Sequence, residues 1–205
     1  MMMTELLLAS NNEHKSREFA RLFPGVAIRV PRDIGIDFDF PEHGESFFAN
    51  AQGKAAALYR LARRPVIADD SGLCVASLGG EPGIFSARYG SAPGSAPLEA
   101  PRRNEYLLER MSGMQGRDAY FVCCLVLVLS ETRFLAAQET VPGVIAQAPR
   151  GTNGFGYDPL FFLPQAGKTM AELPDVDKDR ISHRGRAAGR IRALICGETD
   201  DREDR

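Results

Sequence analysis

The feature that most constrains the fold is the apolar run AYFVCCLVLVL at residues 119–129. It falls well short of the roughly 20 apolar residues that a membrane-spanning helix needs. The polar triplet at 130–132 separates it from a second run, RFLAAQ, at 133–138, and this arrangement is typical of an antiparallel strand pair. The first run is apolar enough to be a central strand that is buried on both faces, so the sequence predicts a sheet with helices on both sides.

Other strands and helices alternate along the chain. Apolar runs predict strands at 5–9, 26–30, 65–68 and 159–162, and apolar spacings of three and four predict helices after residue 12 and at 45–63, 102–111 and 185–195. This order, with at least one antiparallel pair, indicates an α/β fold with a long mixed β-sheet flanked by helices. At 205 residues we expect one domain over 1–197, and we expect the charged segment ETDDREDR at 198–205 to be a disordered tail.

Charge and composition limit the possible partners. The formal net charge of −2 argues against bulk electrostatic binding to nucleic acid polymers or to anionic membranes. The short apolar run near the N-terminus has no basic region before it, which favours a cytoplasmic protein over a secreted one. The cysteines show no C-x-x-C spacing, and we interpret them as buried, reduced thiols: Cys74, Cys123, Cys124 and Cys196.

The strongest candidate for chemistry is the tetrad Asp69-Asp70-Ser71-Gly72, which we place at the C-terminal end of the strand PVIA. Open α/β sheets bind ligands at such strand ends. Strand alternation points Asp69 and Asp70 to opposite faces, so one can bond internally while the other binds a hard cation such as Mg²⁺. The alternative is a plain turn, because Asp and Gly favour turns.

Two further segments could contact phosphate. Ser10-Asn11-Asn12 follows the first strand and leads to Lys15, which suits phosphate binding at a helix N-terminus. A simple helix cap with a surface lysine explains the same residues. No G-x-x-x-x-G-K-[ST] run is present, so a P-loop enzyme is disfavoured.

The C-terminal third of the chain carries residues suited to a nucleotide base. The glycine-rich segment GTNGFGYDP at 151–159 allows close approach of backbone to a ligand, with aromatic rings that can stack on a base, although a structural turn is the alternative. Lys178 and the segment SHRGR at 182–186 supply donors for phosphate or a purine oxygen. His183 could equally cap a helix, and no other His or Cys stands at zinc-ligand spacing.

Together these segments resemble the inosine triphosphate pyrophosphatase family, whose members hydrolyse non-standard purine nucleotides. The resemblance covers nearly the whole chain through the motifs LLLASNNEHKSREF, DDSGLCV, GGEPGIFSARYG, GTNGFGYDPLFF and ELPDVDKDRISHRGRA. It implies a two-lobed fold with the active site in the cleft between the lobes, a homodimer, dependence on Mg²⁺, and hydrolysis of the bond between the α- and β-phosphates. The substrates implied are ITP, dITP and XTP, whose removal keeps them out of DNA and RNA.

The resemblance also implies roles for individual residues. Asp70 would be the general base and, with Glu42, a ligand of Mg²⁺. The residues that would contact the substrate are Ser10, Asn11, Asn12, Glu13, His14, Lys15, Ser71, Phe155, Gly156, Tyr157, Asp158, Lys178, His183 and Arg184.

Base selection would follow from hydrogen bonding at C6. Hypoxanthine and xanthine carry an oxygen there, whereas adenine carries an amino group. A donor such as Lys178 would leave adenine with unpaired groups, which costs about 1–3 kcal/mol each on burial.

The sequence departs from the family pattern at one position and leaves two other functions open. Many bacterial members carry Glu before the Asn that corresponds to Asn50, whereas this chain has Ala49, and Glu45 is a candidate substitute. The alternatives are a pyrophosphatase for other modified nucleotides and a nucleotide sensor without catalysis. A turnover assay distinguishes the sensor, because a sensor binds without releasing pyrophosphate.

Overall fold

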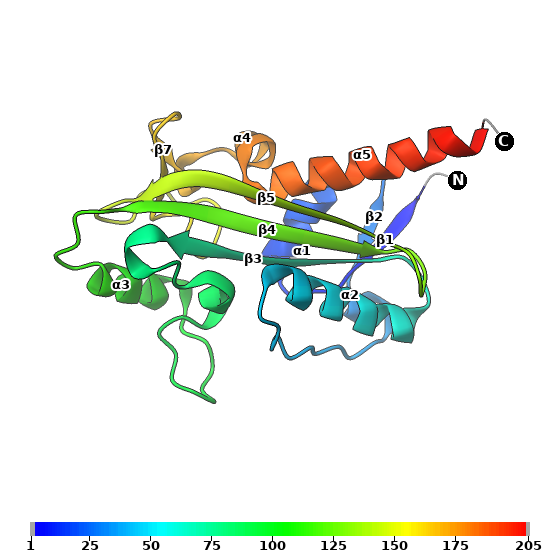
Figure 1. Cartoon of the computed structure of the whole chain (residues 1–205), viewed down its shortest axis with the longest axis horizontal. Coiled ribbons are helices and arrows are strands. Elements are labelled where there is room, and N and C mark those ends of the chain that lie inside the picture. Colours follow the sequence, from blue (N-terminus) through cyan, green and yellow to red (C-terminus); the bar gives the residue numbers. More distant parts are fainter. Residues whose placement is uncertain (1–2, 204–205) are drawn as a thin grey trace. The chain divides into compact units, whose positions relative to one another are not determined.

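The computed structural model describes residues 3–203, with side chains up to residue 197. Its strands are β1 (Glu5–Leu8), β2 (Ala27–Arg29), β3 (Val66–Val75), β4 (Asp118–Val128), β5 (Phe134–Ile145), β6 (Phe161–Leu163) and β7 (Lys168–Thr169). Its α-helices are α1 (Glu13–Leu22), α2 (Phe47–Ala62), α3 (Ala100–Arg110), α4 (Asp175–Ile181) and α5 (His183–Glu203). The strands form one sheet in the order β2-β1-β3-β4-β5-β6-β7 (Figure 1).

The sheet is mixed, as predicted. β1 runs parallel to both β2 and β3, whereas β6 runs antiparallel to β5 and β7. β4 and β5 are neighbours joined by a tight turn, in which the Leu129 amide donates to the Arg133 carbonyl at 2.9 Å, so they form the expected antiparallel pair. The α/β class and the flanking helices are confirmed.

β4 is the middle strand of the sheet, and every residue from Phe121 to Val128 is buried. The prediction of a central strand buried on both faces is therefore confirmed. Cys123 and Cys124 contribute to different hydrophobic clusters, as strand alternation requires.

The described chain divides into two compact units. Unit 1 comprises residues 1–70, 123–139 and 184–205, and unit 2 comprises residues 71–122 and 140–183. In unit 1, Phe19 of α1 and Ile191 of α5 pack with one set of strand residues, and Leu58 of α2 packs with the alternate set. α2 thus covers one face of the strands of unit 1, and α1 and α5 cover the other (Figure 1).

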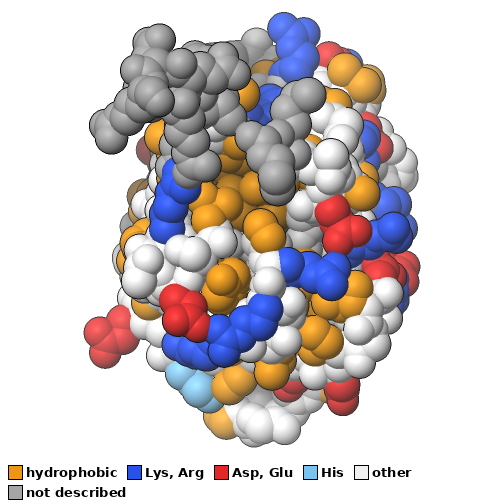
Figure 2. Space-filling model, turned by 90° about the vertical axis from the view of Figure 1, so that its right-hand side faces the viewer, with side chains coloured by type: hydrophobic (Ala, Val, Ile, Leu, Met, Phe, Trp, Pro, Cys, Tyr) orange, Lys and Arg blue, Asp and Glu red, His pale blue; other side chains and the backbone are white. Residues whose placement is uncertain are grey.

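The surface combines charged and hydrophobic side chains. The face in Figure 2 shows hydrophobic side chains gathered between Lys and Arg side chains. Exposed large hydrophobic residues of unit 1 include Phe48, Leu61 and Phe134, and the rings of Phe48 and Phe134 lie 6.2 Å apart. None of the helices in the described part of the chain is long and apolar enough to cross a membrane.

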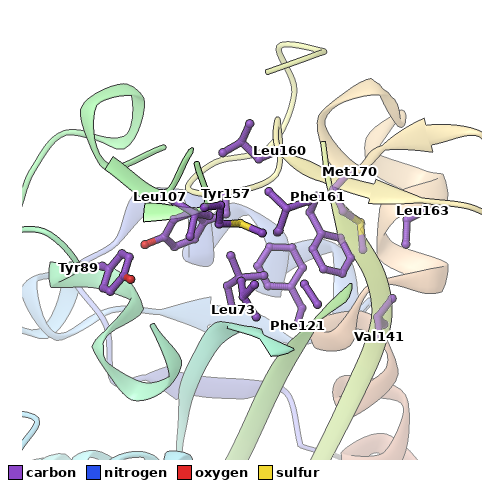
Figure 3. Close-up of a cluster of buried hydrophobic side chains, with 14 of the residues drawn as sticks. Leu73, Tyr89, Leu107, Phe121, Val141, Tyr157, Leu160, Phe161, Leu163 and Met170 are labelled. Carbon is purple, nitrogen blue, oxygen red and sulfur yellow. The ribbon is translucent and has the colours of Figure 1, made fainter. Parts of the chain in front are cut away.

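The core of unit 2 is built around aromatic rings from distant parts of the chain. Phe121 of β4 packs against Phe161 of β6 with ring centroids 4.2 Å apart, and Tyr157 lies in the same cluster (Figure 3). The Tyr157 hydroxyl donates to the Ser86 carbonyl at 2.9 Å, which satisfies its polar end.

Several elements differ from the sequence prediction. β3 does not end at residue 68 but continues to Val75, so the Asp-Asp-Ser-Gly tetrad lies in the middle of a strand and not at its C-terminal end. α4 and β7 were not predicted, because each is very short. Cys196 is exposed, so the expectation of buried thiols holds only for the other three cysteines.

The C-terminal helix is also longer than expected. α5 continues to Glu203 and so enters the segment 198–205 that we expected to be disordered. The side chains from residue 198 onward, and residues 204 and 205 entirely, lie outside the described residues.

Candidate functional site

Two adjacent carboxylates on β3 form the centre of the candidate site in unit 1. Asp69 is 2% exposed and Asp70 is 5% exposed, so both need buried partners. They have separate partners, as the predicted alternation requires: Asp69 contacts residues of α1 and α5, and Asp70 contacts a residue of α2. The turn interpretation of the tetrad is wrong, because polar partners on both sides satisfy the two carboxylates within a continuous strand.

Asp69 is the centre of a buried ionic cluster. Its carboxylate accepts from Arg184 Nε at 2.9 Å and forms an ion pair with Lys15 Nζ. The Cys123 thiol lies 3.4 Å from Asp69 Oδ2, and Arg184 also pairs with Glu18 at 2.5 Å. Burial alone would raise the pKa of Asp69, but Arg184 and Lys15 hold that pKa well below its usual range.

Asp70 lies in a different electrostatic environment. Asn50 Nδ2 donates to Asp70 Oδ2 at 2.9 Å. Burial raises the pKa of Asp70 to about 6; Lys54 opposes this rise, and the negative charge of Glu42 adds to it. A carboxyl group with such a pKa is ionised near neutral pH and is a better proton acceptor than an ordinary aspartate.

Lys54 connects the two carboxylate environments. Its ammonium forms an ion pair with Glu42 and donates to the backbone carbonyl of Asp69 at 2.8 Å. Lys54 is 8% exposed although it carries a charge, and it lies on the same helix as Asn50.

Sequence reasoning missed Lys54, Asn50 and Glu18. A signal was present for Lys54, because it stands among Ala51, Ala55 and Leu58 on the apolar stripe of its helix, where a charged residue needs a buried partner. That partner cannot be read from local spacing, since Glu42 lies in an irregular segment and Asp69 on a strand.

The carboxylates Glu42 and Asp70 are the predicted metal ligands. Among the residues that the structure describes, no group of three or more His, Cys, Asp or Glu side chains could hold a metal ion. The pair Glu42 and Asp70 fits Mg²⁺, which binds through one or two carboxylates and completes its shell with water and substrate phosphates. The negative charge of Glu42 contributes to the raised pKa of Asp70.

The segment from Ser10 to His14 has mainly structural contacts. Asn12 caps α1 by accepting from the His14 and Lys15 amides, and Ser10 Oγ accepts from the Asn12 amide at 3.1 Å. Asn11 Nδ2 donates to the Phe38 carbonyl at 2.8 Å. These bonds fix the loop before α1, so the cap interpretation is correct for Asn12.

The other predicted residues of this region differ in exposure: Glu13 and His14 are exposed, whereas Lys15 is half-buried. Glu13 pairs with Arg32 at 3.2 Å, and His14 lies 3.1 Å from Arg17. Of the loop residues from 10 to 15, Lys15 is the one that the structure brings to the β3 carboxylates, and its side chain is 17% exposed. Ser71 follows Asp70 on β3 and is half-buried.

A second polar cluster lies in unit 2. Asp158 Oδ2 accepts from the Phe155 amide at 2.8 Å and from Lys178 Nζ at 2.7 Å. The Lys178 ammonium also lies 5.0 Å from the centroid of the Phe155 ring. The structure thus brings together three of the predicted base-contacting residues and places a cationic donor beside an aromatic face.

Other predicted base-contacting residues have different surroundings. Tyr157 is in the hydrophobic core of unit 2 (Figure 3), and the Gly156 carbonyl accepts from Asn104 Nδ2 at 3.0 Å. His183 is buried and stacks on Phe121 with centroids 4.6 Å apart. Arg184, the next residue, belongs to the ionic cluster of unit 1 around Asp69.

The chemistry available to these groups is that of a phosphoanhydride hydrolase. Unit 1 offers two lysines for an anion and two carboxylates for a metal ion, and one of these carboxylates, Asp70, has a raised pKa suited to proton transfer. Unit 2 offers a donor and a ring suited to a base.

Comparison with known proteins gives a consistent result. The Ham1 family model matches residues 6–194. A dITP/XTP pyrophosphatase from Treponema denticola is 50% identical over 193 residues, which is 94% of this chain and 99% of the relative. The solved structure of the Staphylococcus aureus Ham1 protein matches with a TM-score of 0.82 at 39% identity, over 95% of this chain and 99% of that chain.

A second solved structure agrees with the first. The HAM1 protein from Coxiella burnetii has a TM-score of 0.84 at 34% identity and covers 96% of this chain and 100% of that chain. The match to the family model and these similarities extend over nearly the whole length of the chain, and the chain therefore belongs to the Ham1 family.

Proposed function

We propose that this protein hydrolyses non-standard purine nucleoside triphosphates, namely dITP, XTP and ITP, to the nucleoside monophosphate and pyrophosphate. The observation that carries the proposal is the cluster around Asp70 of β3, which brings Asp70 and Glu42 together with the half-buried Lys15 and the buried Lys54. The relative from Treponema denticola is a dITP/XTP pyrophosphatase, which supports the same reaction and substrates. Such a reaction removes these nucleotides from the pool used for DNA and RNA synthesis.

The proposed chemical step is attack of water on the α-phosphorus. The water oxygen forms a bond to the α-phosphorus, the bond from that phosphorus to the bridging oxygen of pyrophosphate breaks, and Asp70 accepts the proton of the water. In the metal-free protein, burial and the negative charge of Glu42 raise the pKa of Asp70 to about 6. A bound Mg²⁺ would lower this pKa and would also make the attacking water easier to deprotonate. Asn50, which donates to Asp70 Oδ2, orients the carboxylate.

We further propose that the metal ion is Mg²⁺, held by Asp70 and Glu42. Pyrophosphatases of this family generally depend on a metal ion. When bound, Mg²⁺ would neutralise phosphate charge and lower the pKa of the attacking water. Lys54 pairs with Glu42 in the structure, so this ammonium has to share Glu42 with the metal ion or move towards phosphate.

The triphosphate is assigned to unit 1. Lys15 supplies a partly accessible ammonium, and the segment from Ser10 to Asn12 leads into the N-terminus of α1, whose first residues are Glu13 and His14 and where backbone amides favour anions. Ser71 is assigned a supporting contact to substrate, because it follows Asp70 on the same strand.

The base is assigned to the polar cluster of unit 2. The ring of Phe155 offers a stacking surface, and Lys178 offers a hydrogen-bond donor that matches the C6 oxygen of hypoxanthine and xanthine. Asp158 holds that ammonium and the loop together, and Gly156, Tyr157 and His183 complete the segments around it. Arg184 acts from unit 1, through Asp69.

Pyrophosphate release tests the proposal directly. Purified protein is assayed with dITP, XTP, dATP and dGTP, with Mg²⁺ and with chelator. We expect Mg²⁺-dependent turnover of dITP and XTP, and a loss of about 10²–10⁴-fold in kcat in Asp70→Asn, as for removal of a general base. The matched control is Asp118→Asn, which removes an exposed carboxylate from the sheet and should retain activity.

Two results would contradict the proposal. If dITP and XTP bound without release of pyrophosphate, the protein would be a nucleotide sensor. If dATP and dGTP were cleaved as efficiently as dITP, the assigned selectivity would be wrong.

We also propose a homodimer working in the cytoplasm. The exposed aromatic pair Phe48 and Phe134 supports an apolar contact between copies, and the four free cysteines agree with a reducing compartment. Sedimentation velocity distinguishes a dimer from a monomer, and a monomer at micromolar concentration would contradict the first part.

A further inference from the structure

Asp69 has a different set of contacts from its catalytic neighbour. Its carboxylate contacts Lys15 and Arg184, and its backbone carbonyl accepts from Lys54 at 2.8 Å. A single residue therefore touches three cations. At 2% exposure the residue is almost completely shielded from solvent, so the carboxylate acts on the protein's own groups and not on a substrate.

The cations around Asp69 differ in accessibility. Arg184 is 2% exposed and is shared between Asp69 and Glu18, so that two carboxylates surround one guanidinium. The side chain of Lys15 is 17% exposed and combines the contact to Asp69 with access to solvent. An ammonium has three donors, so Lys15 can keep its bond to Asp69 while it donates to an anion.

Lysine alone is poorly suited to hold a fixed position. Its ammonium sits on a flexible four-carbon stem, and ordering that stem when an anion binds weakens affinity. An ion pair that already orders the stem removes this cost in advance. Because Arg184 neutralises Asp69 from a second direction, the carboxylate can hold Lys15 without presenting an uncompensated negative charge to the anion.

We propose that Asp69 is a positioning residue, which holds the Lys15 ammonium in place for a polyphosphate while Arg184 balances its charge. The identification of the polyphosphate with the triphosphate of the substrate rests on the proposed function. The positioning of Lys15 by Asp69 does not rest on the proposed function, because it concerns affinity for the anion and not turnover.

Binding of inorganic tripolyphosphate, measured by calorimetry in Mg²⁺, tests this role. We expect Asp69→Asn to weaken binding about tenfold or more, and Lys15→Gln to weaken it at least as much. In the double variant we expect less than about a twofold further loss beyond Lys15→Gln alone, because Asp69 acts through Lys15. In turnover, Asp69→Asn should raise KM more than it lowers kcat.

Glu18→Gln is the matched control. It removes the other buried carboxylate that pairs with Arg184 and leaves the contact between Asp69 and Lys15 in place. It should destabilise the fold as Asp69→Asn does, but change the tripolyphosphate Kd by less than about threefold.

If Asp69→Asn and Lys15→Gln had independent effects on the tripolyphosphate Kd, so that the two effects multiplied in the double variant, the proposal would be overturned.

A second measurement does not depend on folding of an Asp69 variant. It is NMR of the protein labelled with ¹⁵N-lysine, with the Lys15 signal assigned through Lys15→Arg. We expect an ordered Lys15 ammonium before any anion is added, and an ammonium as mobile as that of exposed lysines would also overturn the proposal. Failure of the proposed function would be seen separately. In that case tripolyphosphate binding would still depend on Asp69, but the protein would hydrolyse no purine triphosphate.

Discussion

Asp70→Asn should make the metal-free protein more stable while it removes activity. Burial raises the pKa of Asp70 from 3.8 to about 6, so the folded state binds the proton more tightly than the unfolded chain does. The stability that comes from protonated Asp70 is fully present below the unfolded pKa of 3.8, and it is lost as the pH rises through about 6. At neutral and alkaline pH the protein therefore carries a buried charge that it would fold better without.

The magnitude follows from the size of the shift. A change of about two pKa units, at 1.36 kcal/mol per unit, amounts to about 3 kcal/mol at pH 8. By the same linkage, the stability that the parent loses through ionisation of Asp70 is about 1.6 kcal/mol at pH 5 and about 0.6 kcal/mol at pH 4. Asn is neutral and of the same shape, and its side-chain oxygen can still accept from Asn50.

Urea unfolding followed by circular dichroism, in chelator at several pH values, measures this difference. We expect the gain in the free energy of unfolding of Asp70→Asn to be largest at pH 8 and to shrink towards pH 4. Asp118→Asn, at an exposed position, should show no such trend. A variant less stable than the parent at pH 8, or a gain independent of pH, would refute the assignment of a strained, buried carboxylate.

Two further changes test other parts of the structure. Gly154→Ala should lower stability and weaken nucleotide binding, because Gly154 has a φ of +73° and an added Cβ would overlap the Asp158 carboxylate. The control Gly156→Ala has a φ of +64° and open space around it, so it should cost only about 1–2 kcal/mol of stability, from backbone strain alone. Equal melting temperatures for the two variants would contradict the overlap with Asp158. Arg184→Met should lower the free energy of unfolding by about 3–5 kcal/mol, because it removes the guanidinium that two buried carboxylates, Asp69 and Glu18, share. The control Arg190→Met breaks an exposed ion pair and should change the free energy of unfolding by less than about 1 kcal/mol. Equal free energies of unfolding for the two Arg variants in chemical denaturation would be inconsistent with a buried cluster at Arg184.

The sheet could be predicted from the sequence because its strands have strong local patterns. The run at 119–129 is apolar on both faces, and the structure places it at the centre of the sheet. The opposite orientations of Asp69 and Asp70 also followed from alternation along a strand. What local pattern could not show is that β3 continues past Ser71, because Asp and Gly favour turns unless distant residues satisfy the carboxylates.

The candidate site was predictable in part, for the same reason. The resemblance to a known family points to Glu42, Lys15 and Asp70 as site residues, whereas the sequence analysis assigns Lys54 no role. Its contacts to Glu42 and to the carbonyl of Asp69 depend on how an irregular segment and a strand meet, which helical spacing does not encode.

The position of two neighbouring carboxylates in the middle of β3 limits how this protein can change. A shift of the strand by one residue moves every side chain to the other face of the sheet. Such a shift would turn both carboxylates to the opposite faces of the sheet, so Asp69 and Asp70 could not both keep their present partners, Arg184 and Asn50. We therefore expect an insertion or a deletion of one residue in β3 before Asp69 to abolish the arrangement of the site.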